Sequence, residues 1–412
     1  MGKGKFRRSR RGVIAGPGVM ATATLLVLTA CGSSTSSNGG SSTAAATVPA
    51  ASASASDAAV NDYQQVSEFL LSDTGSYESP PTTAPAPQPG KKMWLISCGQ
   101  AYTSCSIPIG EAETAAKSIG WDTKIFDDQG DPTTAITGIR QAIADKADSI
   151  FLYYIDCSYV AKGLVEARAA GVKVAAAESV DCGEADPNAA NLFDYVVTYS
   201  GGLSGPVEGG QASYLETISA WGEAQGDLAV TKVDGKANAL VFTDNYGIGG
   251  KQAAEGMNKA LSSCDGCSSQ VIEFPYEALA NGELTSIVKQ ALLKNPEVNV
   301  VAAAYDAIAV YGLAQAAADA KRDIVVIGGE GSSAGMDLVR AGQITLGAGL
   351  PLGWEGYAAV DALNRLLQGQ APVPTGMGLQ LFDKDHNVPA TGAYAAPFDY
   401  AAIYAKAWGA TS

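Results

Sequence analysis

The stretch TKIFDDQGDPTTAITGIRQAIADKADSIFLYYID, residues 123–156, contains the pattern that decides the fold. Its two ends, residues 123–127 and 149–155, are short runs rich in large apolar side chains, which are typical of strands. The segment between them, residues 133–145, has the length and composition of a helix. Because the second run is apolar at successive positions, and therefore on both faces, the unit predicts parallel strands in a sheet that helices cover.

The same alternation extends over most of the chain. Further strands are predicted at residues 93–97, 173–179, 194–200, 237–244, 271–276, 298–305, 323–330 and 344–351. Helix-like stretches are found at residues 158–170, 207–224, 249–262, 283–294, 306–319 and 354–368. About 320 residues exceed one comfortable hydrophobic core, so the predicted fold class is α/β with two doubly wound parallel-sheet lobes. The Gly- and Pro-rich residues 199–210 mark the break between them.

The N-terminus has the layout of an export signal. Six basic residues precede residue 12, a mildly apolar stretch follows, and LTAC at residues 28–31 ends it. LTAC resembles the bacterial lipoprotein box, which implies removal of residues 1–30 and acylation of Cys31 as a membrane anchor. The alternative is an ordinary signal peptide with a chance cysteine. Ser9-Arg10-Arg11 also resembles a twin-arginine signal, and the export route stays open.

Residues 31–90 are expected to form a disordered tether rich in Ser, Ala and Pro. Residues 32–60 contain almost no large apolar side chain that could support folding. Residues 61–72 could form a short helix, and the Pro-rich residues 79–90 should act as an extended spacer. The folded protein is therefore expected to start near Lys91.

Charge and composition exclude several functions. The chain has 27 basic and 42 acidic residues, and removal of residues 1–30 changes its net charge from −15 to 21 − 42 = −21. Such a surface repels nucleic acids. With His386 as its one histidine, the chain lacks material for a Ser–His–Asp triad or a multi-histidine metal site. We expect no metal, no cofactor and no catalytic residue.

Six cysteines remain once Cys31 is assigned to the anchor, and outside the cytoplasm thiols pair. Fifteen connectivities are possible. Local spacing favours three pairs, namely Cys98 with Cys105, Cys157 with Cys182, and Cys264 with Cys267. A redox or metal motif is the alternative for the CDGC turn at residues 264–267.

Several segments together resemble the type I periplasmic binding proteins of the ribose-binding kind, which are receptors for ABC transporters. They are residues 127–156, 161–179, 300–320 (VVAAAYDAIAVYGLAQAAADA) and 323–363. The resemblance covers about residues 92–383. It implies two lobes joined by a hinge of several crossings. Residues 91–202 with about 350–375 would form the first lobe, and residues 203–349 with about 376–412 the second.

In this fold, ligands sit beyond the carboxyl ends of parallel strands, where carboxylates and amides accept hydroxyl hydrogen bonds and aromatic rings stack. The residues at these positions are the ligand-binding candidates. They are Ser97, Gln100, Tyr102, Asp156, Glu178, Ser179, Asp244, Asn245, Tyr246, Tyr276, Tyr305, Asp306, Glu330 and Trp354. Core packing is the alternative for the tyrosines, and helix capping for Asp306.

This chain departs at three positions from the pattern of the family that it resembles. The pair Glu178-Ser179 stands where Asp-Arg is common, Lys251 is the base where an Arg is common, and Tyr305 replaces an Asn. Fewer guanidinium groups make a pentose or hexose doubtful. A larger glycoside, a polyol or a less polar ring compound is equally open.

The resemblance implies a monomeric, lipid-anchored receptor on the outer face of the bacterial cell membrane that delivers a small molecule to an ABC transporter permease. A sensor of the same fold that feeds a signalling receptor is the alternative. An enzyme is disfavoured, because GGEGSSAG at residues 328–335 lacks the G-x-G-x-x-G spacing and the chain has no G-x-S-x-G elbow.

Overall fold

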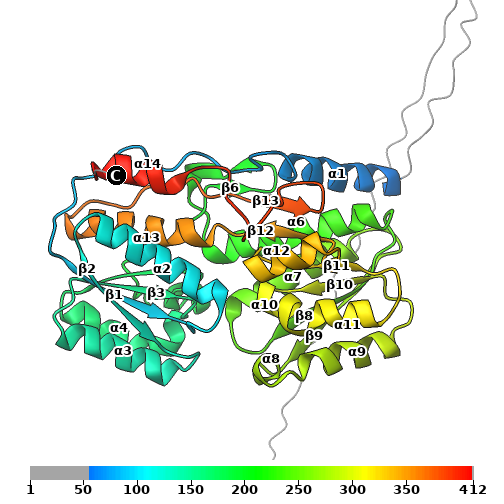
Figure 1. Ribbon diagram of the computed structural model, residues 1–412, viewed down its shortest axis with the longest axis horizontal. Helices are drawn as coiled ribbons and strands as arrows, with labels where there is room; N and C mark the ends of the chain where they lie inside the picture. Colours follow the sequence, from blue (N-terminus) through cyan, green and yellow to red (C-terminus); the bar gives the residue numbers. More distant parts are fainter. Residues whose placement is uncertain (1–54, 411–412) are drawn as a thin grey trace, which may run out of the picture. The chain divides into compact units, whose positions relative to one another are not determined.

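The computed structural model describes residues 55–410, and side chains from residue 62 onward. Cys31 and the export signal therefore lie outside the described residues. Two α/β lobes are seen side by side in Figure 1, each with its own sheet. No helix in the described part of the chain has the length and apolarity needed to cross a membrane.

The first lobe contains a five-stranded parallel sheet in the order β2-β1-β3-β4-β5. Helices α2 and α13 cover one face, and α3 and α4 cover the other. Strand β1 is buried on both faces, with Leu95 and Trp94 in two different core clusters. The strands are β1 (Lys92–Ser97), β2 (Asp122–Asp127), β3 (Ser149–Tyr153), β4 (Lys173–Ala177) and β5 (Tyr195–Val196). The helices are α2 (Thr103–Ser118), α3 (Pro132–Ala144), α4 (Cys157–Ala169), α5 (Cys182–Ala185) and α13 (Leu352–Leu367).

The second lobe contains a six-stranded sheet in the order β13-β12-β11-β10-β8-β9, which is parallel except for β13. Its strands are β8 (Asn238–Asp244), β9 (Ser268–Phe274), β10 (Val300–Ala303), β11 (Val325–Ile327), β12 (Leu346–Gly349) and β13 (Gln380–Asp383). Its helices are α6 (Tyr214–Lys232), α7 (Ile248–Ser262), α8 (Glu277–Asn281), α9 (Leu284–Lys294), α10 (Asp306–Ile308), the π-helical η2 (Ala309–Leu313), α11 (Ala314–Asp319) and α12 (Ser333–Arg340). The predicted class of two parallel-sheet lobes is confirmed.

Several segments cross between the lobes and hold each other in place. The first follows β5 and includes the hairpin of β6 (Gly201–Gly202) with β7 (Gly205–Pro206) and the short helix η1 (Glu208–Gly210). It is bonded to the crossing before β13, with Ser200 N donating to Met377 O at 2.6 Å. Thr375 Oγ1 donates to Thr198 O at 2.8 Å. The hinge is therefore a hydrogen-bonded layer rather than a set of free strands.

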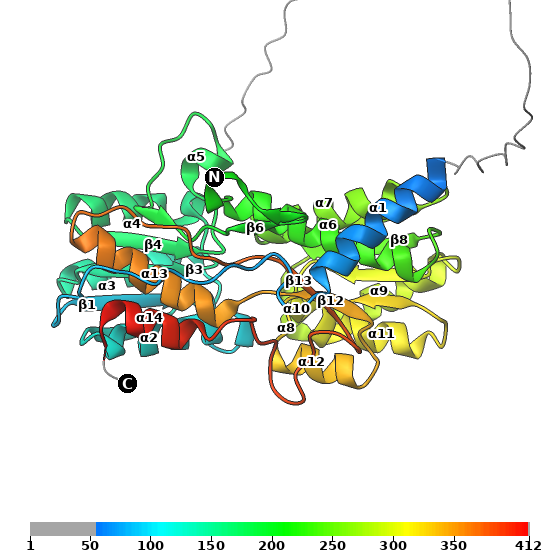
Figure 2. The ribbon, with the colours of Figure 1, turned by 90° about the horizontal axis from the view of Figure 1, so that it is seen from above.

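The folded protein begins well before the predicted Lys91. Helix α1 (Ala55–Leu70) packs on α6, as Figure 2 shows from above. Leu70 and Tyr77 are buried, and Ser76 N donates to Leu379 O at 2.9 Å in the hinge layer. The expectation of a tether up to residue 90 is wrong for this part, because a few apolar side chains in a polar stretch are sufficient to dock it.

Two further elements differ from the predicted pattern. Helix α6 starts at Tyr214 rather than residue 207, because Ser213 and Glu216 form a capping box. Helix α14 (Tyr400–Trp408) lies in the segment assigned to the second lobe, yet it packs on α13 and α2 of the first. Figure 2 shows it beside α13.

All three cysteine pairs favoured by local spacing are present as disulfides. The pair Cys264–Cys267 joins the end of α7 to the start of β9. Its thiols are therefore not free to form the alternative metal or redox motif.

Candidate ligand-binding site

A cavity lies between the two lobes. From the first lobe it is lined by Cys98, Tyr102, Ser104, Cys105, Tyr153, Tyr154 and Glu178, and from the second by Tyr246, Tyr276, Leu279, Tyr305, Ala307 and Glu330. Its volume of about 50 Å³ is small beside the roughly 300–1,000 Å³ of sites for drug-sized ligands. In this arrangement of the lobes, the cavity suits a compact ligand.

The strand order explains why these residues meet. In each sheet the order reverses at one place, between β1 and β3 in the first lobe and between β8 and β10 in the second. Ligands of open parallel sheets bind at such points, outside the carboxyl ends of the strands. Tyr102 and Tyr154 follow β1 and β3, and Tyr246 and Tyr305 follow β8 and β10. The two reversal points therefore face one cavity.

Two residues of the cavity have left-handed backbone conformations. Tyr154 has φ +55° and Glu178 has φ +47°, and they directly follow β3 and β4. This region is unfavourable for residues other than Gly and Asn, and such strain persists mainly where the surroundings enforce it. A hydrogen bond from Tyr154 N to Ala177 O, at 3.1 Å, ties the two strand ends together.

A disulfide fixes the loop that carries Tyr102. Cys98 follows β1 directly, and Cys105 lies in the first turn of α2. Tyr102 is the residue that precedes α2. Closing so small a loop restricts the backbone between the two cysteines, so the ring of Tyr102 is held at the cavity wall.

The electrostatics of the cavity are dominated by buried carboxyl groups. Glu178 and Glu330 are 4% and 6% exposed. Burial, followed by the charge of Glu355, raises the pKa of Glu178 well above its ordinary value. Burial and then Asp306 do the same to the pKa of Glu330. Glu355, behind the cavity on α13, accepts hydrogen bonds from Tyr153 (2.9 Å) and Tyr199 (2.6 Å), and burial raises its pKa to about 7.

Six of the predicted ligand contacts line the cavity. They are Tyr102, Glu178, Tyr246, Tyr276, Tyr305 and Glu330. Of these, Tyr246 and Tyr276 are stacked with their ring centroids 4.9 Å apart.

The predicted aspartates bind backbone or neighbouring side chains instead. Asp156 Oδ1 accepts from Val180 N at 2.8 Å. Asp306 accepts from Gly331 N at 3.1 Å and from the Ser332 hydroxyl. Asp244 accepts from Tyr246 N at 2.8 Å and from the Tyr305 hydroxyl, so it supports two tyrosine positions from behind. The structure does not place these carboxylates on the cavity wall.

Three smaller predicted residues also have internal partners. The Ser97 hydroxyl accepts from Gln100 Nε2 at 2.7 Å, which turns the Gln100 amide toward its own strand. The Ser179 hydroxyl accepts from Ile155 N at 3.0 Å. These residues shape the strand-end turns, and the prediction that they line the site does not match the structure. Asn245 likewise accepts from Tyr276 N at 3.1 Å rather than facing the cavity.

Trp354 is not at the cavity. It lies in α13 with no exposed surface, stacked on Tyr77 at 5.8 Å and on Tyr400 at 5.7 Å between ring centroids. The prediction placed it in the cleft because it opens the helix after a crossing strand. The N-terminal segment at Tyr77 and the start of α14 at Tyr400 cover it, and neither was expected there.

The predicted site list omitted three groups that matter. Tyr153 and Tyr154 were not among the candidates, although both line the cavity. Glu355 was not considered because it lies inside a helix rather than at a strand end. The signal available in the sequence was the acidic Glu355 on an otherwise apolar face of the helix.

The lobes are in contact beside the cavity. Tyr159 Oη on α4 donates to Tyr246 O at 2.8 Å, and Ile248 N at the start of α7 donates to Asp156 Oδ2 at 3.4 Å. A Cβ at position 247 would lie 2.6 Å from Tyr154 Oη, so a larger residue there would require the Tyr154 side chain to move. The structure thus shows the lobes closed on each other.

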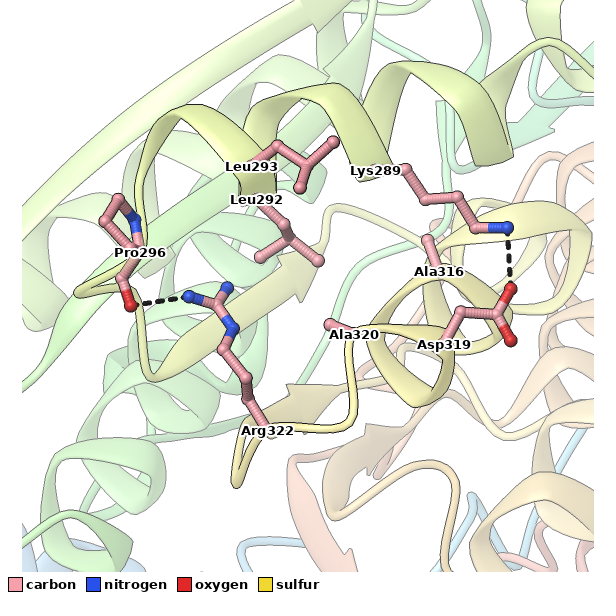
Figure 3. Close-up of a pocket in the computed structure, with 8 residues that line it drawn as sticks. All are labelled: Lys289, Leu292, Leu293, Pro296, Ala316, Asp319, Ala320 and Arg322. Carbon is pink, nitrogen blue, oxygen red and sulfur yellow. Dashed lines mark hydrogen bonds and ion pairs between the residues drawn. The ribbon is translucent and has the colours of Figure 1, made fainter.

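Two other features of the described residues lack the properties of the cavity between the lobes. The cluster of Cys157, Asp181 and Cys182 has metal-ligand spacing, but its cysteines form a disulfide. A hollow of about 440 Å³ lies between α9 and α11 (Figure 3), bordered by the ion pair of Lys289 with Asp319 at 2.6 Å. It is open and belongs to the second lobe alone.

The arrangement of two parallel-sheet lobes around a cavity at their strand ends defines a two-lobed solute-binding protein. The sequence pattern of the periplasmic binding protein domain matches residues 106–371. The chain belongs to this family, and the predicted recognition is confirmed at this level. Family membership assigns it an extracytoplasmic location and a binding rather than an enzymatic role.

Solved structures with the same two-lobed fold agree with this architecture. An ABC transporter solute-binding protein from Mycobacterium smegmatis, with bound glycerol, is 21% identical with a TM-score of 0.60, over 74% of this chain and 99% of that one. One from Actinobacillus succinogenes 130z, with bound D-allose, is 17% identical with a TM-score of 0.61, over 72% and 98%. The XylFII–LytSN complex is 16% identical with a TM-score of 0.59, over 73% and 100%. No curated protein sequence matches the chain.

Proposed function

We propose that the protein is a lipid-anchored receptor that encloses a compact small molecule, sugar-like or less polar, and delivers it to an ABC importer. The observation that carries the proposal is the cavity at the reversal points of both sheets. A ligand that touches both lobes stabilises the closed state by its differential affinity for that state. The bound glycerol and D-allose of the two similar structures support a compact polar ligand.

A thermal-shift screen of residues 55–412 against sugars, polyols, amines and small aromatics tests the binding function. A ligand at a hundredfold excess over its Kd should stabilise the protein by about 2.7 kcal/mol. Tyr102→Ala, which removes one ring from the cavity wall, should abolish the shift. A screen in which no compound raises the melting temperature contradicts the proposal.

The anchor is proposed at Cys31. Cys31→Ser should release the protein from membranes into the medium, whereas Ser33→Ala, two residues further on, should leave it bound. Retention of the Cys31→Ser protein in the membrane fraction contradicts the anchor.

We also propose that the receptor is a monomer. Light scattering after gel filtration measures its mass in solution and checks this proposal.

Sensing is the second candidate function, and the similarity to XylFII in its complex with LytSN favours it. Deletion of the gene separates the two candidates. An importer receptor is required for uptake of its ligand, whereas a sensor is required for the transcriptional response and leaves uptake by other routes intact.

A further inference from the structure

The charged groups on the cavity wall all have one sign. Apart from tyrosines, the ionisable residues that line the cavity are Glu178 and Glu330, and no Lys, Arg or His is among the lining residues. Lys251, the base at the position where an arginine is common in the resembling proteins, instead pairs with Glu273 at 2.9 Å. The protein therefore supplies no counter-charge of its own at the cavity wall.

Both carboxyl groups have an oxygen without a partner. Glu178 Oε1 and Glu330 Oε2 are buried and accept no hydrogen bond. A buried carboxyl that lacks a partner is costly, and such exceptions in native structures require an explanation. Here both unpartnered groups belong to the wall of the same cavity, one from each lobe.

Further carboxyl groups lie behind the cavity wall. Glu355 lies behind Tyr153, and Asp244 lies behind Tyr305, each held by a hydroxyl hydrogen bond. Charges on Glu355 and Glu330 disfavour ionisation of Glu178, which means that the carboxyl groups interact across the cleft. When Glu178 and Glu330 are both ionised and no cation lies between them, their repulsion opposes closure of the lobes.

The remaining wall is aromatic. Tyr102, Tyr153, Tyr154, Tyr246, Tyr276 and Tyr305 line the cavity. The faces of aromatic rings attract cations, and the attraction is strongest where water is excluded. Tyrosines around buried carboxylates form a site that favours positive charge.

We propose that the ligand is a small organic cation, with a protonated amino or quaternary ammonium group held between Glu178 and Glu330 and surrounded by the tyrosines. This inference rests on the proposed function, in which the cavity is the ligand site. A cation between one carboxylate of each lobe converts their repulsion into an attraction, so binding favours the closed state. An amino sugar belongs to this class, as does choline.

The competing possibility is a neutral polyol that accepts hydrogen bonds from protonated Glu178 and Glu330. Matched pairs of compounds distinguish the two. Choline has nearly the shape of uncharged 3,3-dimethylbutan-1-ol. D-glucosamine differs from D-glucose by one amino group, and ethanolamine differs from ethylene glycol in the same way.

The experiment measures the affinity of residues 55–412 for each compound by calorimetry, with thermal shift as a second readout. At least one cation should bind at least about tenfold more tightly than its neutral partner. In Glu178→Gln and Glu330→Gln this preference should fall below about threefold. Glu273→Gln, which removes an exposed carboxylate on β9, is the matched control and should keep the preference.

Folding of the variants is checked in the absence of ligand, where removal of a buried unpartnered carboxylate should raise the melting temperature. If neutral partners bind as tightly as the cations, or more tightly, the cation inference is overturned and the receptor function stands. If none of the compounds binds, the result counts against the proposed function itself.

Discussion

At the scale of single residues, side-chain length separates structural from ligand-facing carboxylates. Asp244 accepts a backbone N–H two residues further along the chain, whereas Asp156 and Asp306 each accept one from the residues that follow the neighbouring strand. Glu178 and Glu330 have one more methylene, and their free oxygens are at the cavity wall. All five lie at the end of a strand or shortly after it, so position alone did not distinguish the two groups.

Replacing Trp354 tests its placement in the core. Trp354→Ala should lower the free energy of unfolding by about 3–5 kcal/mol, because it leaves a large cavity under Tyr77 and Tyr400. Ligand affinity of the folded variant should be nearly unchanged. Urea denaturation and calorimetry measure the two quantities.

Tyr102→Ala is the control and should show the reverse pattern, with a large loss of affinity and a small loss of stability, since Tyr102 is only partly buried at the cavity wall. A large loss of affinity in the folded Trp354→Ala protein would return Trp354 to the binding site.

Glu355 should make the unliganded protein less stable as pH rises. Its pKa is raised to about 7 by burial, from an ordinary value of 4.5, so between these values the folded state holds a proton that the unfolded chain loses. Stability from this group is complete below the unfolded pKa and is lost as pH rises through the folded pKa. The hydroxyls of Tyr153 and Tyr199 and the carboxyls of Glu178 and Glu330 face it.

The measurement compares the free energy of unfolding at about pH 5.5 and about pH 8. The decrease should be smaller in Glu355→Gln than in the unchanged protein, and the difference between the two isolates Glu355 from other titrating groups. Equal decreases in both proteins contradict a raised pKa for this residue.

At the scale of elements, apolar runs predicted the strands well. Each of the ten predicted strands overlaps a strand of the structure, although the run at 194–200 contains only the two-residue β5 before the chain leaves the lobe. Burial on both faces makes such runs visible in a single sequence. Helix boundaries were less accurate, since the Ser213–Glu216 capping box and not composition fixes the start of α6.

Strand β13 and helix α14 were missed, because their placement depends on surfaces that other segments create. A short helix at residues 61–72 was predicted and overlaps α1, but its docking on α6 was missed for the same reason. For the same reason the sequence located the cavity at the strand ends but did not predict Tyr153, Tyr154 or Glu355. The direction of a side chain at a strand end depends on backbone dihedrals such as the positive φ of Tyr154.

Docking of the N-terminal segment should contribute measurably to stability. A chain that starts at Lys91 loses the buried side chains of Leu70 and Tyr77 and the bond from Ser76 N to Leu379 O. Burial of each large apolar side chain is worth roughly 1.5–3 kcal/mol, so residues 91–412 should be several kcal/mol less stable than residues 55–412. Urea denaturation checks this, and equal stabilities would mean that the segment only rests on the surface.

At the scale of the whole folded part, the cavity exists only because the two lobes meet. Its wall takes seven residues from the first lobe and six from the second. The hinge layer connects the lobes through backbone hydrogen bonds near Ser200, Met377 and Leu379. Such a layer permits rotation of rigid lobes while each core stays packed, which is the hinge closure of solute-binding proteins.

Contacts between the lobes outside the cavity should stabilise the closed state and so raise the affinity for the ligand. Tyr159→Phe removes one cross-lobe bond, from Tyr159 Oη to Tyr246 O, and leaves the cavity wall intact. A single hydrogen bond is worth about 0.5–1.5 kcal/mol net, so ligand affinity should fall by roughly two- to tenfold. Because Tyr159 is partly exposed, the free energy of unfolding without ligand should change little.

Small-angle scattering completes this test, since the Phe variant should have a larger radius of gyration than the unchanged protein at a subsaturating ligand concentration and the same radius at saturation. Tyr63→Phe is the control, because the Tyr63 hydroxyl bonds to Ser263 on the second lobe, away from the cleft. If Tyr159→Phe matches that control in affinity and in scattering, the cross-lobe bond does not take part in closure, and the closed state depends on the ligand and the carboxyl groups of the cavity alone.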